Sequence, residues 1–308
     1  MVRTLPALLL LLVVHGACAP KDSSPPADVL SPPVQPLPLT LATWNLDNFS
    51  EKGEHEPRVQ AIANEITALD ADIVAVQELK VPIPSDGTID AAYTTLDELL
   101  DGHVGIHAPW DADDTTVGIL YRPDRLELLD SRALFEEDWF AFPRPPLTAT
   151  FSTIPEGIEF TVIVLHLKAF QDGEQRRRDA CAKLDAYIRA QPVTQHVVIG
   201  DFNDDPFDAE HSNVFADTFL ADPEYYDFTG LDLPPASVTS TGWYHYVEGE
   251  KIKGEFIDHV LLTRAFAEDW VRASPEIHGV PADEYDAWID YSSDHFPVSL
   301  RLDPASPR

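Results

Sequence analysis

Two short polar strings carry the groups that hydrolysis of a phosphoester requires. The string Gly-Asp-Phe-Asn at Gly200–Asn203 follows the apolar run His196–Ile199. The string Ser-Asp-His-Phe-Pro at Ser293–Pro297 precedes the run Val298–Leu302. Both therefore lie at predicted strand ends, where a sheet can direct side chains toward one point. Carboxylates can hold a hard cation, an amide can orient water and an imidazole can meet a phosphate oxygen, so the pattern predicts phosphoester chemistry.

The elements that must position these strings alternate between strands and helices. Helical spacing extends over Arg58–Leu69 and Glu174–Arg189, and the Arg176–Arg178 run is predicted to form a solvated helix face. Apolar patterns predict strands over Leu39–Asn45, Asp72–Gln77, Val117–Tyr121, Leu126–Leu134, Leu147–Ser152 and Ile158–His166. The strands Val117–Tyr121 and Leu126–Leu134 are predicted to form a hairpin around residues 122–124. Two late strands, around residues 244–246 and over residues 256–262, are predicted to pair with each other.

Length and composition favour a globular enzyme-sized chain. With 308 residues, 44% of them hydrophobic, the chain can bury a large core as one large domain or two small ones. Its 53 acidic and 21 basic residues give a formal charge of −32. This charge repels polyanions at long range and is screened within about 10 Å at 0.1 M salt. A polyanionic substrate must therefore be held by local features.

The N-terminal segment is predicted to direct export. Residues 1–17 combine Arg3, the apolar run Leu8–Val14 and small residues before Cys18, which is the pattern of a signal peptide. The Gly-Ala-Cys ending resembles a bacterial lipobox and predicts a lipid on Cys18 that anchors the protein to the membrane at the cell envelope. Because His15 stands where an aliphatic residue is usual, ordinary cleavage and secretion is the alternative. Residues 18–38 are rich in Pro and Ser and predict a tether, which leaves residues 39–304 for the catalytic domain.

Six motifs in order resemble those of the endonuclease/exonuclease/phosphatase superfamily, the group that includes DNase I. They lie at Thr43–Asn45, Val76–Glu78, Leu165–Lys168, Gly200–Asn203, Ile257–His259 and Ser293–His295. Each motif alone is weak, but six in sequence are specific. The resemblance implies a four-layer α/β sandwich, in which two packed mixed β-sheets are flanked by helices and the active site lies across their common edge.

The resemblance also implies which residues bind metal and phosphate. Asn45, Glu78 and Asp294 are expected to hold Mg²⁺ (or Mn²⁺) through oxygen ligands. Glu78 follows a buried apolar strand, where a carboxylate requires a cation or another partner. Arg144 and Lys168 are expected to contact the substrate phosphate, because bonds from a cation to phosphate are charge-assisted.

The same resemblance implies the catalytic roles. Asp201 is expected to deprotonate or orient the attacking water, and Asn203 to hold that water or the phosphate in line. His295 would donate to a nonbridging phosphate oxygen, and Asp258 would fix the tautomer of His295. His166 would stabilise or protonate the leaving oxygen. The implied reaction is in-line attack on the phosphorus by an activated water.

Several of these positions also have ordinary structural interpretations. An Asn after a strand, such as Asn45, often caps a turn, and a His at the end of a buried strand, such as His166, is often a satisfied core residue. Nucleases like DNase I pair this His with a Glu where the present chain has Thr115, which puts the acid strength of His166 in doubt. Asp204 and Asp205 match no family role and are interpreted as solvated loop acids.

Three interpretations of the substrate remain open. A DNase I-like nuclease, with nucleic acid as its partner, is favoured because residues 144–147 and 239–241 resemble segments of secreted bacterial nucleases. The few Lys and Arg residues argue for a phosphatase or a phospholipase C-type, sphingomyelinase-like enzyme instead. Trp243, Tyr244 and Tyr246 could stack a base or touch a lipid headgroup, although aromatic strand residues are more often core. A noncatalytic surface-binding module is disfavoured because every motif position is filled, and a monomer is expected.

Overall fold

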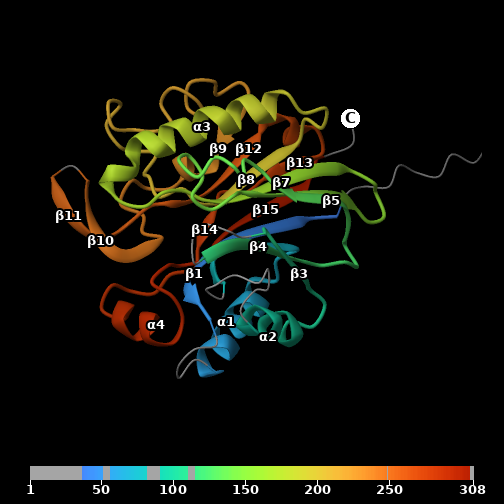
Figure 1. Cartoon of the computed structure of the whole chain (residues 1–308), viewed down its shortest axis with the longest axis horizontal. Helices are drawn as coiled ribbons and strands as arrows, with labels where there is room; N and C mark the ends of the chain where they lie inside the picture. The colour runs from blue at the N-terminus through green and yellow to red at the C-terminus, as the bar shows by residue number, and fades with distance from the viewer. Residues whose placement is uncertain (1–36, 51–55, 82–90, 110–114, 248, 306–308) are drawn as a thin grey trace, which may run out of the picture. The chain divides into compact units, whose positions relative to one another are not determined.

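The computed structural model describes residues 37–50, 56–81, 91–109, 115–247 and 249–305. Two β-sheets lie face to face, and helices cover the outer face of each (Figure 1). The predicted four-layer α/β sandwich is therefore confirmed. The predicted signal peptide, Cys18 and the tether up to residue 36 lie outside the described residues. Among the described helices, none is long and apolar enough to span a membrane.

The first sheet has seven strands in the order β13-β15-β1-β2-β4-β3, with β14 also paired to β15. Its strands are β1 (Leu39–Phe49), β2 (Ile73–Lys80), β3 (Val104–His107), β4 (Thr115–Tyr121), β13 (Trp270–Arg272), β14 (Glu276–Ile277) and β15 (Val298–Pro304). Its outer face packs against α1 (Glu56–Leu69), α2 (Ala91–Leu99) and α4 (Tyr285–Tyr291). Only the β1–β2 pair is parallel among the described pairings of this sheet.

The second sheet has six strands in the order β5-β6-β7-β8-β12-β9. They are β5 (Leu126–Ala133), β6 (Leu147–Thr153), β7 (Glu159–His166), β8 (His196–Asp201), β9 (Tyr226–Phe228) and β12 (Asp258–Thr263). Helix α3 (Glu174–Arg189) covers its outer face. Three 3-10 turns, η1 (Gln171–Gly173), η2 (Thr229–Asp232) and η3 (Arg264–Glu268), lie in the connections, and a hairpin of β10 (Ser240–Val247) and β11 (Glu250–Glu255) projects from the edge (Figure 1).

The apolar content of the central strands explains the layers. On β7, Val162 and Val164 belong to the core between the sheets, whereas Ile163 and Leu165 pack under α3. A strand that is apolar on both faces must be covered on both faces. The continuous apolar runs in the sequence therefore specify internal strands, each with a sheet on one side and a helix on the other.

The hairpin predicted from Val117–Tyr121 and Leu126–Leu134 is wrong. Strand β4 pairs with β2 and β3 in the seven-stranded sheet, whereas β5 pairs with β6 in the six-stranded sheet. The turn between them carries the chain from one sheet to the other. Tyr121 and Leu126 both face the core between the sheets, so either arrangement satisfies the same apolar pattern.

The predicted pairing of the two late strands is also wrong. Strand β10 pairs with β11, and β12 lies between β8 and β9. The stretch between residues 247 and 258 supplies a strand of its own, β11, whose polar sequence hid it from the apolar pattern. The core interpretation is also wrong for Trp243 and Tyr246, which are exposed, and the side chain of Tyr244 lies outside the described part of the structure.

Candidate active site

Strand pairing brings three of the predicted catalytic residues side by side at one edge of the six-stranded sheet. His166 at the end of β7 lies opposite Asp201 at the end of β8, and Asp201 lies opposite Asp258 at the start of β12. The seven-stranded sheet contributes Asn45, whose Nδ2 donates to Asp201 Oδ2 over 3.0 Å. Residues distant in sequence therefore meet where the two sheets share an edge.

One glycine makes this approach possible. Gly200 has a φ of +143°, and a Cβ at this position would lie 2.1 Å from the carbonyl oxygen of Leu165. Any side chain would therefore push β8 away from β7. The glycine before Asp201 is needed for the position of the carboxylate beside His166.

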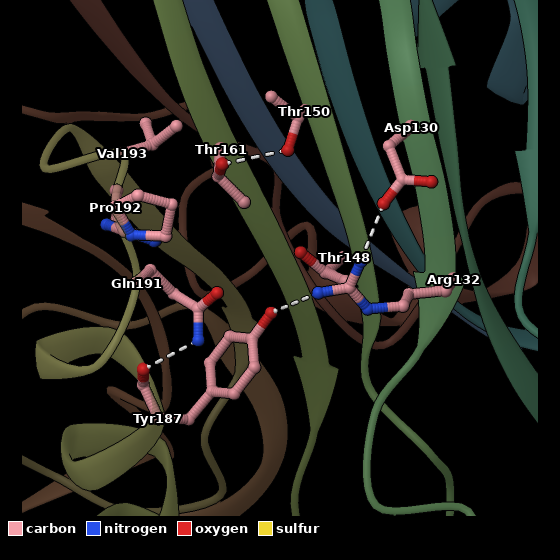
Figure 2. A pocket seen from close by; sticks show the side chains of 10 residues that line it. Asp130, Arg132, Thr148, Thr150, Thr161, Tyr187, Gln191, Pro192 and Val193 are labelled. Carbon is pink, nitrogen blue, oxygen red and sulfur yellow. Dashed lines mark hydrogen bonds and ion pairs between the residues drawn. The ribbon is translucent and has the colours of Figure 1, made fainter.

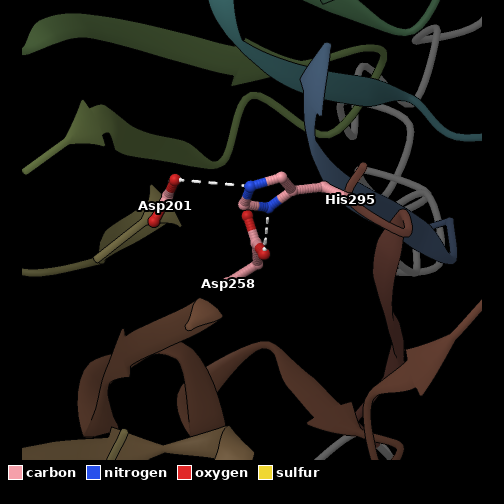
Figure 3. Close-up of side chains that lie close together, drawn as sticks. All are labelled: Asp201, Asp258 and His295. Atoms are coloured by element: carbon pink, nitrogen blue, oxygen red, sulfur yellow. Dashed lines mark hydrogen bonds and ion pairs between the residues drawn. The ribbon is translucent and has the colours of Figure 1, made fainter. Parts of the chain in front are cut away.

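His295 is held between two carboxylates, as Figure 3 shows. Its Nδ1 lies 2.8 Å from Asp258 Oδ2, and its Nε2 lies 4.0 Å from Asp201 Oδ2. Its carbonyl oxygen accepts hydrogen bonds from the indole nitrogens of Trp44 and Trp288, each over 3.0 Å. The ring and the backbone of His295 are thus both fixed, and Nε2 lies near Asp201 Oδ2 and, at 3.8 Å, Asp294 Oδ1.

The environment moves the pKa values of the three titratable groups apart. Burial opposes the charge on His295, but Asp258, Asp201 and Asp294 together raise its pKa well above the usual value. Burial and the charge of Asp258 raise the pKa of Asp201 to about 7, against the opposing effect of His295. Burial lowers the pKa of His166 well below its usual value, and Arg144, His295 and Lys168 add to this effect. The site therefore combines a charged imidazole, a carboxylate that titrates near neutrality and a neutral imidazole.

A second group of acids lies beside this trio. Glu78 accepts from Asn45 Nδ2 over 3.2 Å and from the backbone nitrogen of Asn48 over 2.8 Å. Burial raises the pKa of Asp294 to about 6; His295 opposes the shift, and the charges of Asp47 and Glu78 add to it. These carboxylates repel one another, which is the electrostatic condition that a bound cation would relieve.

Arg58 supplies a fixed positive charge next to these acids, and its sequence position offered no signal. Its guanidinium donates to the carbonyl oxygens of Ser292 over 2.6 Å and Asp47 over 2.8 Å. Burial lowers the pKa of Arg58, while Asp47, Asp294 and Glu78 oppose that effect. The guanidinium thereby ties helix α1 to the end of β1, which carries Asp47, and to the segment that carries Asp294.

The backbone around the site is strained. Glu78, Asp47, Asn48 and Asn203 have φ values of +60°, +44°, +51° and +53°, in the left-handed region that side chains disfavour. The pairing of β1 with β2 shifts register between Asn45 and the end of β1, and such bulges redirect side chains. Strain at the motif residues Glu78 and Asn203, and just after the motif that ends at Asn45, is typical of a functional site.

The predicted phosphate contacts lie beside His166. Arg144 Nε donates to Thr115 Oγ1 over 3.1 Å, and its Nη1 donates to the carbonyl oxygen of Leu167 over 3.3 Å. Lys168 is half-buried next to the same strand end. Thr115, which stands where nucleases like DNase I have a Glu, therefore accepts from Arg144 and not from His166. Among the described residues, His166 Nδ1 has no hydrogen-bond partner. Asn203 closes this side of the site by donating from Nδ2 to the same Leu167 carbonyl over 3.0 Å.

Two predictions about neighbouring charges are wrong. Asp204 is buried, not solvated, and its Oδ2 accepts from Arg177 Nε over 2.6 Å; Asp205 is half-buried. Arg177 is also buried, and its Nη1 donates to the carbonyl oxygens of Lys168 over 2.7 Å and Phe170 over 2.8 Å. This pair ties helix α3 to the loop after His166 and to the loop after Asp201. No local pattern could have revealed a pairing across 27 residues.

Two hydroxyl residues also support the site. Ser293 Oγ donates to the carbonyl oxygen of Asn45 over 2.6 Å and accepts from the backbone nitrogen of His295 over 3.0 Å. Thr239 Oγ1 accepts from the backbone nitrogens of Ile257 and Asp258, each over 3.0 Å. Both residues belong to strings noted in the sequence, but only the fold shows what they contact.

A separate cavity of about 190 Å³ lies at the opposite ends of β7 and β8 (Figure 2). Its lining includes Thr161, His196 and Arg132. Arg132 donates to Asp130 Oδ2 over 2.7 Å and to the Tyr187 hydroxyl over 3.0 Å. None of the predicted site residues lines this cavity.

A group of three residues could also hold a metal by distance alone. Ligand atoms of Asp201, Asp258 and His295 lie within 4.8 Å of one another in the described part of the chain. A histidine must be neutral to bind a metal, whereas the surroundings of His295 favour its charged form. The chemistry of this trio therefore fits a hydrogen-bonded acid-base group better than a metal site.

Comparison with known proteins identifies the family of the chain. The model of the Endonuclease/Exonuclease/phosphatase family matches residues 42–295. No curated protein matches the chain.

Solved structures share the fold. An endonuclease/exonuclease/phosphatase from Bacteroides vulgatus is 19% identical, with 87% of this chain and 99% of that chain covered and a TM-score of 0.61. D. rerio TDP2 complexed with single strand DNA product is 17% identical, and the match covers 86% of this chain and 99% of that chain with a TM-score of 0.63. A Bacteroides thetaiotaomicron mannosyl-6-phosphatase is 18% identical, with coverage of 86% and 99% and a TM-score of 0.59.

Proposed function

Because this chain belongs to the endonuclease/exonuclease/phosphatase family and is a phosphoester hydrolase, we propose that it is a divalent-metal-dependent nuclease that cleaves phosphodiester bonds. The observation that carries the proposal is the arrangement of His295 between Asp258 and Asp201. The Nδ1 of His295 is bound to Asp258, and its Nε2 lies 4.0 Å from an Asp201 carboxylate that titrates at about 7. A charged donor thus lies beside a base with a pKa suited to neutral pH.

The acidic residues fit a hard cation. Glu78 and Asp294 offer carboxylate oxygens, and Asn45 Oδ1 accepts from the Asp47 backbone nitrogen over 3.0 Å while retaining a second lone pair. We propose that Asn45, Glu78 and Asp294 hold Mg²⁺ or Mn²⁺, which prefer such oxygen ligands. When bound, the cation would polarise the phosphate and stabilise the charge that develops on its oxygens.

Asp201 is the proposed base for the attacking water. Its Oδ1 accepts from the backbone nitrogen of Asn203 over 2.8 Å, and its Oδ2 accepts from Asn45, so the orientation of the carboxylate is fixed. Once ionised, it can take the proton of a water held by Asn203. His295, kept charged by Asp258, donates to the phosphate oxygen that gains charge.

His166 is proposed to act as a neutral donor. Its low pKa and the absence of a described partner at Nδ1 argue against a charged imidazolium that would give up a proton. Its Nε2 lies 3.4 Å from Asp201 Oδ2, the proposed base, and 3.9 Å from Glu78 Oε1, which would hold the metal. We assign it a hydrogen bond to the leaving oxygen, with Arg144 and Lys168 supplying local positive charge to the phosphate.

Nucleic acid is the substrate that we propose first. D. rerio TDP2, a structural neighbour, is complexed with single strand DNA product. The alternative is a small phosphoester, because another neighbour is a mannosyl-6-phosphatase and the chain has only 21 basic residues. The third candidate substrate is a lipid phosphodiester such as sphingomyelin.

The test is a substrate comparison with a matched inactive protein. The purified protein is incubated with Mg²⁺ and, separately, with single-stranded and plasmid DNA, sphingomyelin and a sugar phosphate. We expect DNA to be consumed, and Asp201→Asn to lose this activity under the same conditions. Consumption of the sugar phosphate or of sphingomyelin alone would replace the nuclease with the corresponding alternative. Consumption of none would contradict the proposal.

We also propose that the protein is exported and is a monomer. A lipid on Cys18 would anchor it at the bacterial cell envelope; in the alternative, it is cleaved and secreted. The support is the Gly-Ala-Cys string and the tether composition of residues 18–38. Globomycin blocks lipoprotein signal cleavage, so the uncleaved precursor should accumulate in treated cells. Unchanged processing would favour ordinary secretion.

A further inference from the structure

Two large aromatic rings meet in solvent beside the proposed active site. The Phe170 side chain is 64% exposed and the Trp243 side chain is 61% exposed. Their ring centroids lie 6.4 Å apart, edge to face at 78°. Lys168 Nζ lies 5.1 Å from the centroid of the Phe170 ring, within the range of a cation–π contact. An exposed aromatic pair beside a cation offers two ring faces and a positive charge to a ligand.

The backbone contacts place this pair at the mouth of the site. Phe170 follows His166 by four residues in the loop after β7. On the other side, the backbone nitrogen of Thr241 donates to the carbonyl oxygen of Asp294 over 2.8 Å. A Cβ at Gly242 would lie 3.8 Å from Asp294 Oδ2. Trp243 is the next residue, so one ring comes from the segment after His166 and the other from the segment beside Asp294.

Phe170 is held in a conformation that has an energetic cost. Its φ is +69° and its ψ is +164°, a combination that a residue with a side chain rarely adopts. Its carbonyl oxygen accepts from the buried Arg177 over 2.8 Å, which keeps the loop in this shape. The loop therefore presents an apolar ring to water from a strained backbone position. A purely structural aromatic would gain stability by being buried.

The charge of the chain suggests what the rings are for. With a formal charge of −32, the protein cannot draw a polyanion to its surface by general attraction. Stacking of bases on aromatic rings supplies affinity that does not depend on many cations, and it tolerates any base because each has a π face. Lys168 beside Phe170 can meet the phosphate attached to the same nucleotide.

We propose that Phe170, Trp243 and Lys168 form a platform that stacks an unpaired nucleobase next to the scissile phosphate. The aromatic platform, meaning these three residues, rests on the proposed nuclease function and specifies its substrate as single-stranded or unstacked nucleic acid. In a paired duplex the base faces are already stacked on their neighbours, so the platform discriminates in favour of unpaired nucleotides.

The test compares an oligothymidylate with an oligomer of the same length and the same phosphates but without bases. Binding of both is measured by fluorescence anisotropy in an Asp201→Asn background with Mg²⁺, and cleavage of both is measured with the wild-type catalytic residues. We expect the oligothymidylate to bind about 5-fold to 100-fold more tightly, the range for one stacked base. The difference should appear in KM more than in kcat.

Variants then locate the source of that preference. Trp243→Ala and Phe170→Gly should reduce it toward one, and Trp243→Phe should retain most of it. Residue 170 has φ +69° and ψ +164°, a conformation that Gly adopts without strain, so the loop keeps its shape. The matched control is Trp139→Ala, because Trp139 is 67% exposed and lies in the loop between β5 and β6. It should leave the preference unchanged.

The outcomes separate this inference from the function on which it rests. If the wild-type protein cleaves both oligomers equally well, the nuclease stands and the platform is overturned. If it cleaves neither, both are overturned. The platform would also be overturned if Trp139→Ala lost the preference for the oligothymidylate as fully as Trp243→Ala does. Binding to sphingomyelin vesicles that depends on Trp243, without any preference for bases, would overturn it too.

Discussion

The two ends of the same pair of strands, β7 and β8, each carry a buried histidine, but only one end has the features of an active site. Burial lowers the pKa of both His166 and His196. At the His166 end, Asp201 and Glu78 lie 3.4 Å and 3.9 Å away. At the His196 end, the groups that set the pKa are burial and the backbone of Thr194, without a contribution from a charged side chain.

The backbone differs between the two ends as well. Glu78 and Asn203 near His166 have positive φ values, and Gly200 permits the close contact of β8 with β7. The strands near His196 are regular, and hydroxyl groups line the cavity beside it. Burial of a histidine is therefore insufficient evidence of catalysis. Convergent charges on a strained backbone distinguish the two regions.

Removal of divalent metal should have the largest effect, and it should act only at the His166 end. Glu78, Asn45 and Asp294 present hard oxygen ligands, so EDTA should reduce hydrolysis to background and Mg²⁺ or Mn²⁺ should restore it. The rate with each added ion is the measurement. A full rate in EDTA would contradict the assignment of these three residues.

Asp201→Asn should have the next largest effect. The substitution keeps the size of the side chain but removes the charge that accepts a proton, so kcat should fall by at least about 10²-fold. Substrate binding should persist or tighten, since repulsion of the phosphate decreases, and the melting temperature should stay within a few degrees. If Asp201 were only a turn residue, turnover would stay within a few-fold, because Asn is equally suited to turns.

The pH profile should report the base at this end of the strands. Burial, with the charge of Asp258, raises the pKa of Asp201 to about 7, and the base acts only when ionised. The kcat/KM should therefore rise about tenfold per pH unit below pH 7 and level off above it. Asp201 ionises at a lower pH in the unfolded chain than in the folded protein. The free energy of unfolding should therefore decrease as the pH rises from the usual pKa of 3.8 to about 7. A flat activity profile between pH 5 and about 8 would exclude Asp201 as the base.

His196→Asn should have the smallest effect and sharpen the contrast. The change lies at the cavity end of β8, five residues before Asp201 on the same strand. We expect activity within about two-fold of the wild type and a stability change of about 1 kcal/mol, the centre of the range for point substitutions. A loss of activity comparable to that of Asp201→Asn, with the fold intact, would show that the two ends are coupled.

Sequence patterns predicted the positions of most central strands because those strands are apolar on both faces. They also predicted Asn45, Glu78, Asp201 and Asp294 as polar residues at strand ends, and the structure gathers these residues at one edge. They failed for Asp204, because a carboxylate in a turn-forming string looks solvated until its partner is known. That partner, Arg177, lies on a helix 27 residues earlier.

What the sequence by itself determined is local: most of the central strands follow from the apolar pattern, since apolar period and residue type are properties of neighbours in the chain. The six motifs indicated the family through a resemblance, and the family match over residues 42–295 confirms it. What only the tertiary structure decided is which distant groups meet. It placed β4 and β5 in different sheets, buried Arg177 against Asp204 and brought Phe170 to Trp243. The physical reason is that an apolar pattern specifies that a face must be covered, but many partners can cover it equally well.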